Sequence, residues 1–180
     1  MKYYLVALFD ESSSSGITEL QRNISKRYRL YKNTPVLHIP LGVVNNNDID
    51  KLDGVLTKML SPYKKFKIGI NNNIIFNEDS NMVGLKVEDK GYINRISRKL
   101  FDTLSLYGVN IKEYNGSTFN IPISNANHSI RKASMNGNLC IDNKKSKEDF
   151  YKFIKINRIE IWKQMNNNKD IVKSYPLKDF

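Results

Sequence analysis

The chain is poor in cysteine, and it has no long hydrophobic run. A single cysteine, Cys140, can form neither an intrachain disulfide nor a cysteine-rich zinc site, so we expect a reducing, cytoplasmic compartment. No stretch approaches the roughly 18 consecutive apolar residues that span a membrane. The apolar run at 3–9 leads into Asp10 and Glu11, and it predicts a buried strand rather than a secretion signal.

Common catalytic motifs are missing as well. The sequence contains no glycine-rich phosphate loop, no Gly-x-Ser-x-Gly elbow, no His-Glu-x-x-His and no Cys-x-x-Cys. We therefore expect no metal and no cofactor. There are only two histidines, His38 and His128, so few side chains are suited to proton transfer near neutral pH.

The overall composition is that of a globular domain, with a strong excess of positive charge. Hydrophobic residues make up 40% and charged residues 26% of the 180 positions. Lys and Arg number 29 against 18 Asp and Glu, which gives a net charge of +11. Such a charge favours polyanions such as RNA, DNA or anionic lipid. A solvated lysine surface, or the Asn, Ile and Lys bias of an AT-rich coding sequence, would give the same net charge. Polyanion binding and a charge without a function therefore both stay open.

Hydrophobic periodicity predicts strands separated by amphipathic helices. Strands are expected at 3–9, 35–44, 66–70, 74–76, 82–87, 118–124, 153–162 and 171–177. Helices are expected at 17–28 after a capping serine run at 12–15, at 49–60 between Asp48 and Pro62, and at 93–107 before Gly108. Asparagine triplets at 45–47, 71–73 and 166–168 predict turns, and 128–140 predicts a short helix or loop.

An internal repeat indicates the architecture. The segment Leu37-His38-Ile39-Pro40-Leu41 is echoed by Phe119-Asn120-Ile121-Pro122-Ile123, and each follows a strand and a helix at similar spacing. A proline in a strand removes a ladder N–H and confines the strand to an edge or a bulge. We predict an α+β fold with two pseudo-symmetric βαβ-like lobes whose antiparallel sheets surround a central cleft. It forms one bilobal domain over 1–180, with halves at 1–64 plus 153–180 and at 65–152.

His38 is the first candidate for a functional residue. Strand alternation puts His38 and Pro40 on one face and the flanking apolar residues on the other, so His38 is expected to point into the cleft. Asn120 holds the matching place in the second lobe, which predicts that both side chains meet in one cavity at a pseudo-twofold axis. The alternative, a structural histidine in a strand, stays open.

The two segments resemble the motifs of the two-histidine (2H) phosphoesterases, whose bacterial branch is labelled 2′-5′ RNA ligase or RNA 2′,3′-cyclic phosphodiesterase. Members begin with a strand and an amphipathic helix, followed by a His-x-Thr/Ser-x motif in each lobe. Residues 35–41 are similar to the first motif and 119–123 to the second, while 156–162 and 175–177 resemble the family's ending. The resemblance covers nearly the whole chain.

The resemblance implies roles for these positions. In the family, one histidine acts as general base and one as general acid, and the hydroxyl residues two places on hold phosphate oxygens. His38 would be the remaining acid or base, while Asn120 replaces the second histidine. Asparagine cannot exchange a proton at useful pH, and Pro40 and Pro122 offer neither hydroxyl nor N–H. Hydrolysis or ligation is therefore expected to be weak or lost.

Three more residues are candidates for binding substrate. Ser124 is expected on the same face of its strand as Asn120, and Arg131 would suit a phosphate. His128 could reach the cleft if the chain turns back at 125–127; the alternative is an exposed loop histidine.

These observations leave three hypotheses for function. The first is a degenerate 2H phosphoesterase that acts on or binds RNA ends or nucleotide 2′,3′-cyclic phosphates. The second is a non-catalytic RNA- or protein-binding module on the same fold, and the third is an unrelated basic α+β domain. The expected partner is RNA or a nucleotide with a phosphate end, and no membrane. Under the first hypothesis, Asn120→His with Pro40→Thr and Pro122→Thr should increase hydrolysis.

Overall fold

The structure, a computed structural model, describes residues 1–31, 35–45, 48–78, 80–89, 91–113, 118–135, 151–163 and 170–179. The strands are β1 (Lys2–Phe9), β2 (Ile39–Asn45), β3 (Phe66–Asn77), β4 (Met82–Asp89), β5 (Asn110–Glu113), β6 (Asn120–Asn125), β7 (Tyr151–Trp162) and β8 (Ile171–Pro176). The helices are α1 (Glu11–Arg27), α2 (Ile49–Leu60), α3 (Gly91–Leu106) and α4 (His128–Met135). No helix in these ranges is both long enough and apolar enough to cross a membrane.

The strands form one continuous sheet. Its order is β5-β2-β1-β7-β3-β4-β6, β8 pairs with β7, and neighbouring strands run antiparallel. The predicted α+β class is confirmed. We call β1, β2, β5 and β8 the first lobe and β3, β4 and β6 the second lobe. The long β7 belongs to both, because residues 151–156 pair with β3 and residues 156–162 pair with β1.

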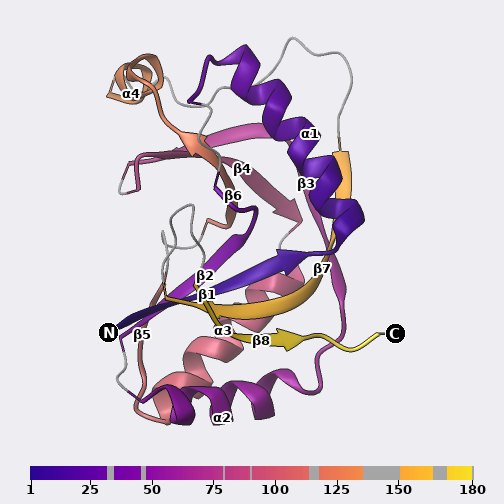
Figure 1. Ribbon diagram of the computed structural model, residues 1–180, viewed down its shortest axis with the longest axis vertical. Helices are drawn as coiled ribbons and strands as arrows, with labels where there is room; N and C mark the ends of the chain where they lie inside the picture. Colours follow the sequence, from indigo (N-terminus) through magenta and orange to yellow (C-terminus); the bar gives the residue numbers. More distant parts are fainter. Residues whose placement is uncertain are drawn as a thin grey trace.

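The sheet is curled, and the helices lie on its outer side (Figure 1). Although β2 and β6 stand far apart in the strand order, some of their Cα atoms approach within 8 Å. Helices α2 and α3 pack on each other beside β5 and β8. Helix α1 lies against the second lobe, where the Gln21 Nε2 donates to the Ile123 carbonyl over 2.8 Å. We call the side of the sheet opposite these helices the inner face.

The helix-covered face carries the main apolar core. It includes Leu5 and Ala7 from β1, Ile121 and Ile123 from β6, and the apolar stripes of the three helices. Ile39 and Leu41 are also in this core, with Leu37 packed against it, as alternation predicts. His38 and Pro40 therefore face the other way, toward the inner face.

Both repeated segments contain a β-bulge one residue after the proline. In the first lobe Val6 pairs with Pro40 and Leu5 pairs with Gly42, so Leu41 is the extra residue. In the second lobe Gly84 pairs with Pro122 and Val83 with Ser124, so Ile123 is the extra residue. This confirms the repeat and the expectation that each proline accompanies an irregular strand.

Three local predictions are wrong, each for a physical reason. Asn71 and Asn73 lie within β3 rather than in a loop, because the register shift between Ile70 and Ile74 accommodates them as a bulge and the Asn71 side chain accepts from the Asn73 N–H. Helix α1 is capped by Asp10, whose carboxylate accepts from the Ser13 N–H, and not by the serines. Strand β5 was not predicted, since its four residues hold a single apolar side chain, Ile111.

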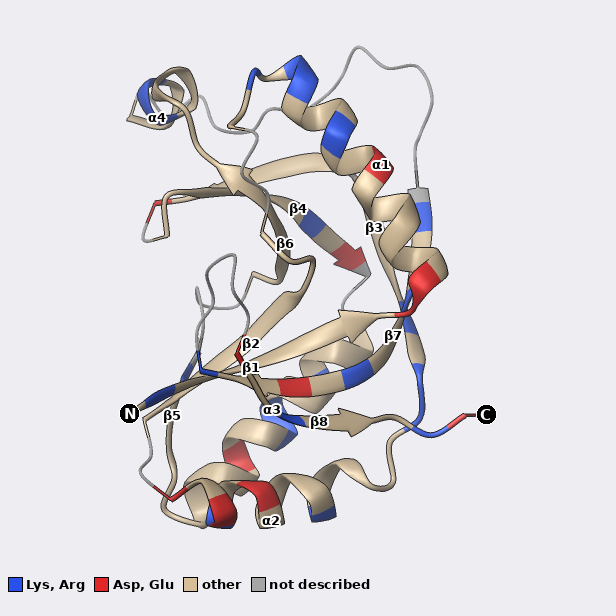
Figure 2. Ribbon diagram, in the orientation of Figure 1, with Lys and Arg blue, Asp and Glu red and all other residues tan. Residues whose placement is uncertain are grey.

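Two predicted helix boundaries are confirmed, and several predicted turns lie outside the described residues. Asp48 caps α2 as expected, and Gly108 follows α3 in the left-handed conformation with φ 72°. The predicted turns at 46–47 and 166–168, and residues 136–140 with Cys140, lie outside the described residues. Lys and Arg are spread over both lobes, including α1 and α4 (Figure 2).

Candidate functional site

His38 lies on the inner face, directly before β2, and is almost completely buried. Its side chain is 1% exposed and sits beside an apolar cluster formed by Val6, Leu8 and Trp162. The ring centroid is 4.9 Å from that of Trp162. Apolar side chains from β1 and β7 thus cover this part of the inner face, and a cavity shared by His38 and Asn120 stays a prediction.

The hydrogen bonds of His38 fix its tautomer. Nδ1 lies 2.6 Å from the Val36 carbonyl, and since a carbonyl can only accept, Nδ1 carries the hydrogen. Nε2 is buried and has no hydrogen-bond partner among the residues that the structure describes. Burial lowers the pKa of His38 from 6.5 to about 4, against the opposing effect of the Val36 carbonyl. The imidazole is thus neutral at physiological pH.

A buried glutamate supports the Trp162 ring. Glu160 lies two residues before Trp162 on β7, on the same face of the strand, and is 3% exposed. Its Oε2 accepts from the Trp162 indole N–H over 2.6 Å, and its Oε1 accepts from the Arg158 Nε over 2.8 Å. The charge of Glu160 is therefore paired, and the indole that packs on His38 is held in one orientation.

Asn120 occupies the matching position in the second lobe, where the surroundings are polar. Asn120 begins β6 opposite Lys86 of β4, and it is 6% exposed. The next inner-face residue of β4 is Gly84, where an added Cβ would lie 2.7 Å from the Asn120 Oδ1. The Lys86 Nζ lies 3.6 Å from Glu88, which also accepts from Asn71 and Asn73. This half of the inner face thus offers a cation and an amide.

Ser124 does not share a face with Asn120, contrary to expectation. The bulge at Ile123 reverses the alternation, so Ser124 pairs with the core residue Val83. Its hydroxyl is fully buried and donates to the Tyr31 carbonyl over 3.0 Å. Ser124 therefore anchors the segment after α1 and is not available to a ligand on the inner face.

His128 and Arg131 are exposed on α4. Helix α4 begins beyond the end of β6 that is remote from Asn120, and a strand of this length spans about 16 Å. The Asn127 side chain accepts from the Ile130 N–H and so starts the helix instead of turning His128 back toward Asn120. Neither residue joins His38 or Asn120.

The structure also identifies neighbours that the sequence analysis missed. Trp162 packs on His38 and is bonded in turn by Glu160, and Lys86 lies opposite Asn120 in the strand register. Alignment of the two repeats would have found Lys86. In that alignment β4 corresponds to β1, so the β4 residue opposite Asn120 follows from the register of the matching strands. Trp162 lies 124 positions after His38, and only the pairing of β7 with β1 brings them together.

Solved structures with the same architecture exist. A phosphoesterase matches with a TM-score of 0.60 and 9% identity over 99% of both chains. Escherichia coli LigT complexed with 3′-AMP matches with a TM-score of 0.62 and 9% identity over 98% of this chain and 97% of LigT. Usb1 of Kluyveromyces marxianus matches with a TM-score of 0.51 and 9% identity over 98% of each chain. No protein-family model and no curated protein matches the sequence.

The chain has the two-histidine phosphoesterase fold. The expected resemblance is therefore confirmed at the level of the fold. The two segments that resemble the family motifs, His38-Ile39-Pro40-Leu41 and Asn120-Ile121-Pro122-Ile123, lie at matching places in the two lobes of this fold. Both contain a bulge one residue after the proline.

Proposed function

We propose that this protein binds phosphate-bearing nucleotides or RNA ends on the inner face of a 2H fold without hydrolysing or ligating them. The observation that carries the proposal is the contrast between the two motif positions. His38 is sealed in an apolar cluster, whereas Asn120 stands beside the cation of Lys86.

The loss of catalysis follows from proton chemistry. Opening a cyclic phosphodiester needs one proton taken from water and one given to the leaving oxygen. His38 is neutral, and its Nε2 does not reach solvent. Asn120 carries no exchangeable proton of suitable pKa. Losing one acid–base partner typically reduces the rate by about 10²–10⁴, and both are compromised in this chain.

Binding is supported by the second lobe. The Lys86 side chain is 40% exposed and carries a charge that can pair with phosphate, while the amide of Asn120 can donate a hydrogen bond to an oxygen. The similar LigT structures contain 3′-AMP, ATP or NADP⁺, ligands that share a phosphorylated nucleoside. We infer the same class of ligand for this chain.

Calorimetric titration with 3′-AMP and 2′,3′-cyclic AMP tests the binding. We expect Lys86→Ala to weaken the affinity about tenfold, because a hydrogen bond to a charged group is lost. Lys51→Ala is the matched control, since this exposed lysine of α2 gives the same change in net charge away from the inner face. Equal affinities for the two variants would contradict the assignment of the inner face.

Turnover is measured in the same samples by ³¹P NMR. We expect no hydrolysis of 2′,3′-cyclic AMP by the wild-type protein. Hydrolysis that disappears in His38→Ala would overturn the non-catalytic proposal and restore His38 as a general acid or base.

A further inference from the structure

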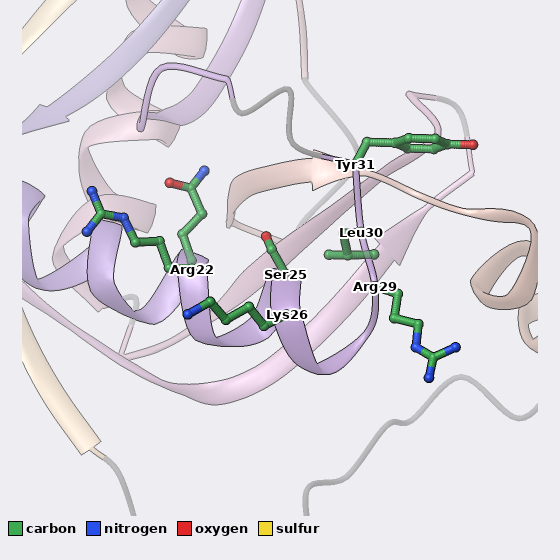
Figure 3. A pocket seen from close by; sticks show the side chains of 7 residues that line it. Arg22, Ser25, Lys26, Arg29, Leu30 and Tyr31 are labelled. Atoms are coloured by element: carbon green, nitrogen blue, oxygen red, sulfur yellow. The ribbon is translucent and has the colours of Figure 1, made fainter.

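A second basic cavity lies outside the inner face, at the end of α1. It has a volume of about 390 Å³, and its lining includes Arg22, Ser25, Lys26, Arg29 and Tyr31. Figure 3 shows Arg22 and Lys26 projecting from successive turns of the helix, while Arg29 and Tyr31 project from the segment that follows. Among the described residues, the lining thus holds three cationic side chains and no acidic one.

Arg29 occupies a position where glycine is usual. The Leu30 N–H donates to the Ser25 carbonyl and the Arg29 N–H to the Lys26 carbonyl, which is the Schellman arrangement at a helix end. Arg29 has φ 51° in this motif, a left-handed conformation that favours glycine. Glycine would adopt this backbone conformation at a lower conformational cost. The arginine at position 29 is therefore not explained by the helix end itself.

The segment carrying Arg29 and Tyr31 is held in place by the second lobe. The Asn127 side-chain amide donates to the Tyr28 carbonyl over 2.8 Å and to the Arg29 carbonyl over 3.2 Å. The Ser124 hydroxyl donates to the Tyr31 carbonyl over 3.0 Å. These contacts fix the backbone from which two of the lining side chains project, so the cavity is preorganised.

Two more features indicate the chemistry of a ligand. The Ser25 Oγ is buried and has no hydrogen-bond partner in the part of the chain that the structure describes, so it can donate to an oxygen that enters the cavity. The Tyr31 side chain is 53% exposed, although tyrosine carries a large apolar ring. An exposed aromatic ring next to several cations suits a base stacked on the ring with its phosphates on the cations.

We propose that this cavity binds an internal segment of single-stranded RNA, with a base on Tyr31 and phosphates on Arg22, Lys26 and Arg29. A phosphodiester chain fits this site better than an isolated anion because it supplies several negative charges and a planar base together. The proposal does not rest on ligand binding at the inner face, since it concerns strand contacts that need no terminal phosphate.

The test uses fluorescence anisotropy with a labelled decauridylate that lacks terminal phosphates. For single strands, log affinity falls with log salt at a slope of about −0.7 per phosphate neutralised. We expect Arg22→Gln, Lys26→Gln and Arg29→Gln each to reduce the slope by about 0.7, and Tyr31→Ala to weaken binding about tenfold. Arg27→Gln is the matched control, because Arg27 is exposed on the same helix outside the cavity lining and should leave the slope nearly unchanged.

A second variant at position 29 distinguishes the effect of the cation on RNA binding from its effect on stability. Arg29→Gly removes the cation and relieves the left-handed backbone, so we expect weaker RNA binding together with a higher melting temperature. Asn81→Gly is its control, because Asn81 also has positive φ, 53°, but does not line the cavity. This variant should bind RNA like the wild type.

Three outcomes would overturn the proposal. The first is an unchanged slope in all three cation variants with a reduced slope in Lys67→Gln, a lysine of the separate cavity beside Tyr92. The second is binding of phosphatidylserine vesicles, lost in the cation variants, without binding of decauridylate. The third is loss of decauridylate binding in Lys86→Ala alone, which would place the strand on the inner face.

Discussion

The His38 and Trp162 rings lie 4.9 Å apart and are inclined to each other by 57°. The contact joins the first motif position to β7, and the Trp162 indole N–H is bound in turn by Glu160. A position that resembles a catalytic histidine in sequence is thus built into a small core. The packing explains the low pKa of His38, and it explains why Nε2 meets no hydrogen-bond partner within the described ranges.

The first prediction concerns stability against pH. His38 has a pKa of about 4 when folded and an ordinary value of 6.5 when unfolded, so between these pH values the unfolded chain binds more protons. The contribution of neutral, buried His38 to the free energy of unfolding is therefore complete above pH 6.5 and is lost as the pH falls toward 4. The difference corresponds to about 3 kcal/mol in the free energy of unfolding. Urea unfolding between pH 7 and pH 4 measures it.

His38→Phe is the control for this measurement, since it keeps a ring against Trp162 and removes the titrating group. Carboxylates also contribute near the acid end, so the quantity to compare is the difference between wild type and variant at each pH. Parallel curves for the two proteins would show that His38 does not carry the dependence.

The second prediction concerns recovery of activity. The sequence comparison alone suggests that Asn120→His with Pro40→Thr and Pro122→Thr should increase hydrolysis. The structure predicts no measurable gain, because His38 remains buried against Trp162 in the triple variant. The assay is hydrolysis of 2′,3′-cyclic AMP across pH 5–8. A bell-shaped profile in a folded triple variant would contradict the buried role of His38.

The third prediction concerns Gly84. A Cβ at this position would lie 2.7 Å from the Asn120 Oδ1 and 3.1 Å from the Ile121 carbonyl oxygen. We expect Gly84→Ala to destabilise the protein by about 1–3 kcal/mol, since the backbone of β6 must move. Gly54→Ala on α2 meets nothing within 4 Å and should stabilise by about 1 kcal/mol. Thermal unfolding compares the two; a stable Gly84→Ala protein would mean that the two strands can separate at no cost.

The fourth prediction concerns Glu160. Glu160→Ala leaves the Trp162 indole N–H buried without an acceptor, which costs about 1–3 kcal/mol. Glu160→Gln keeps an acceptor for the indole and loses only the charge beside Arg158, so it should cost less. Chemical denaturation gives both values. Equal destabilisation by the two variants would mean that the ion pair, not the indole bond, is the important contact.

The sequence predicts the fold well where a local pattern decides it. The amphipathic stripes of α2 and α3 and the paired Ile-Pro segments are visible in the residues themselves. Strand β5 was missed because Asn110–Glu113 holds one apolar residue and is a strand only through its pairing with β2. The triplet 71–73 predicts a turn because asparagine favours turns, whereas Glu88 accepts from the side chains of Asn71 and Asn73 within a strand bulge.

The candidate site was predicted less completely. Alternation correctly placed His38 on the face opposite Ile39, but it carries no information about which distant residues cover that face. Ser124 was misplaced because a single extra residue, Ile123, reverses the alternation of β6. A bulge of this kind has no local signal beyond the preceding proline.

The shared strand β7 has a consequence for how the molecule comes apart. One lobe pairs with its first half and the other lobe with its second half, and the two ladders meet at Ile156, which pairs with Phe9 in β1 and with Phe66 in β3. Displacement of β7 would therefore remove a pairing partner from β1 in the first lobe and from β3 in the second lobe. We expect the two halves to unfold as one cooperative unit, although each half contains a strand–helix–strand repeat in the sequence.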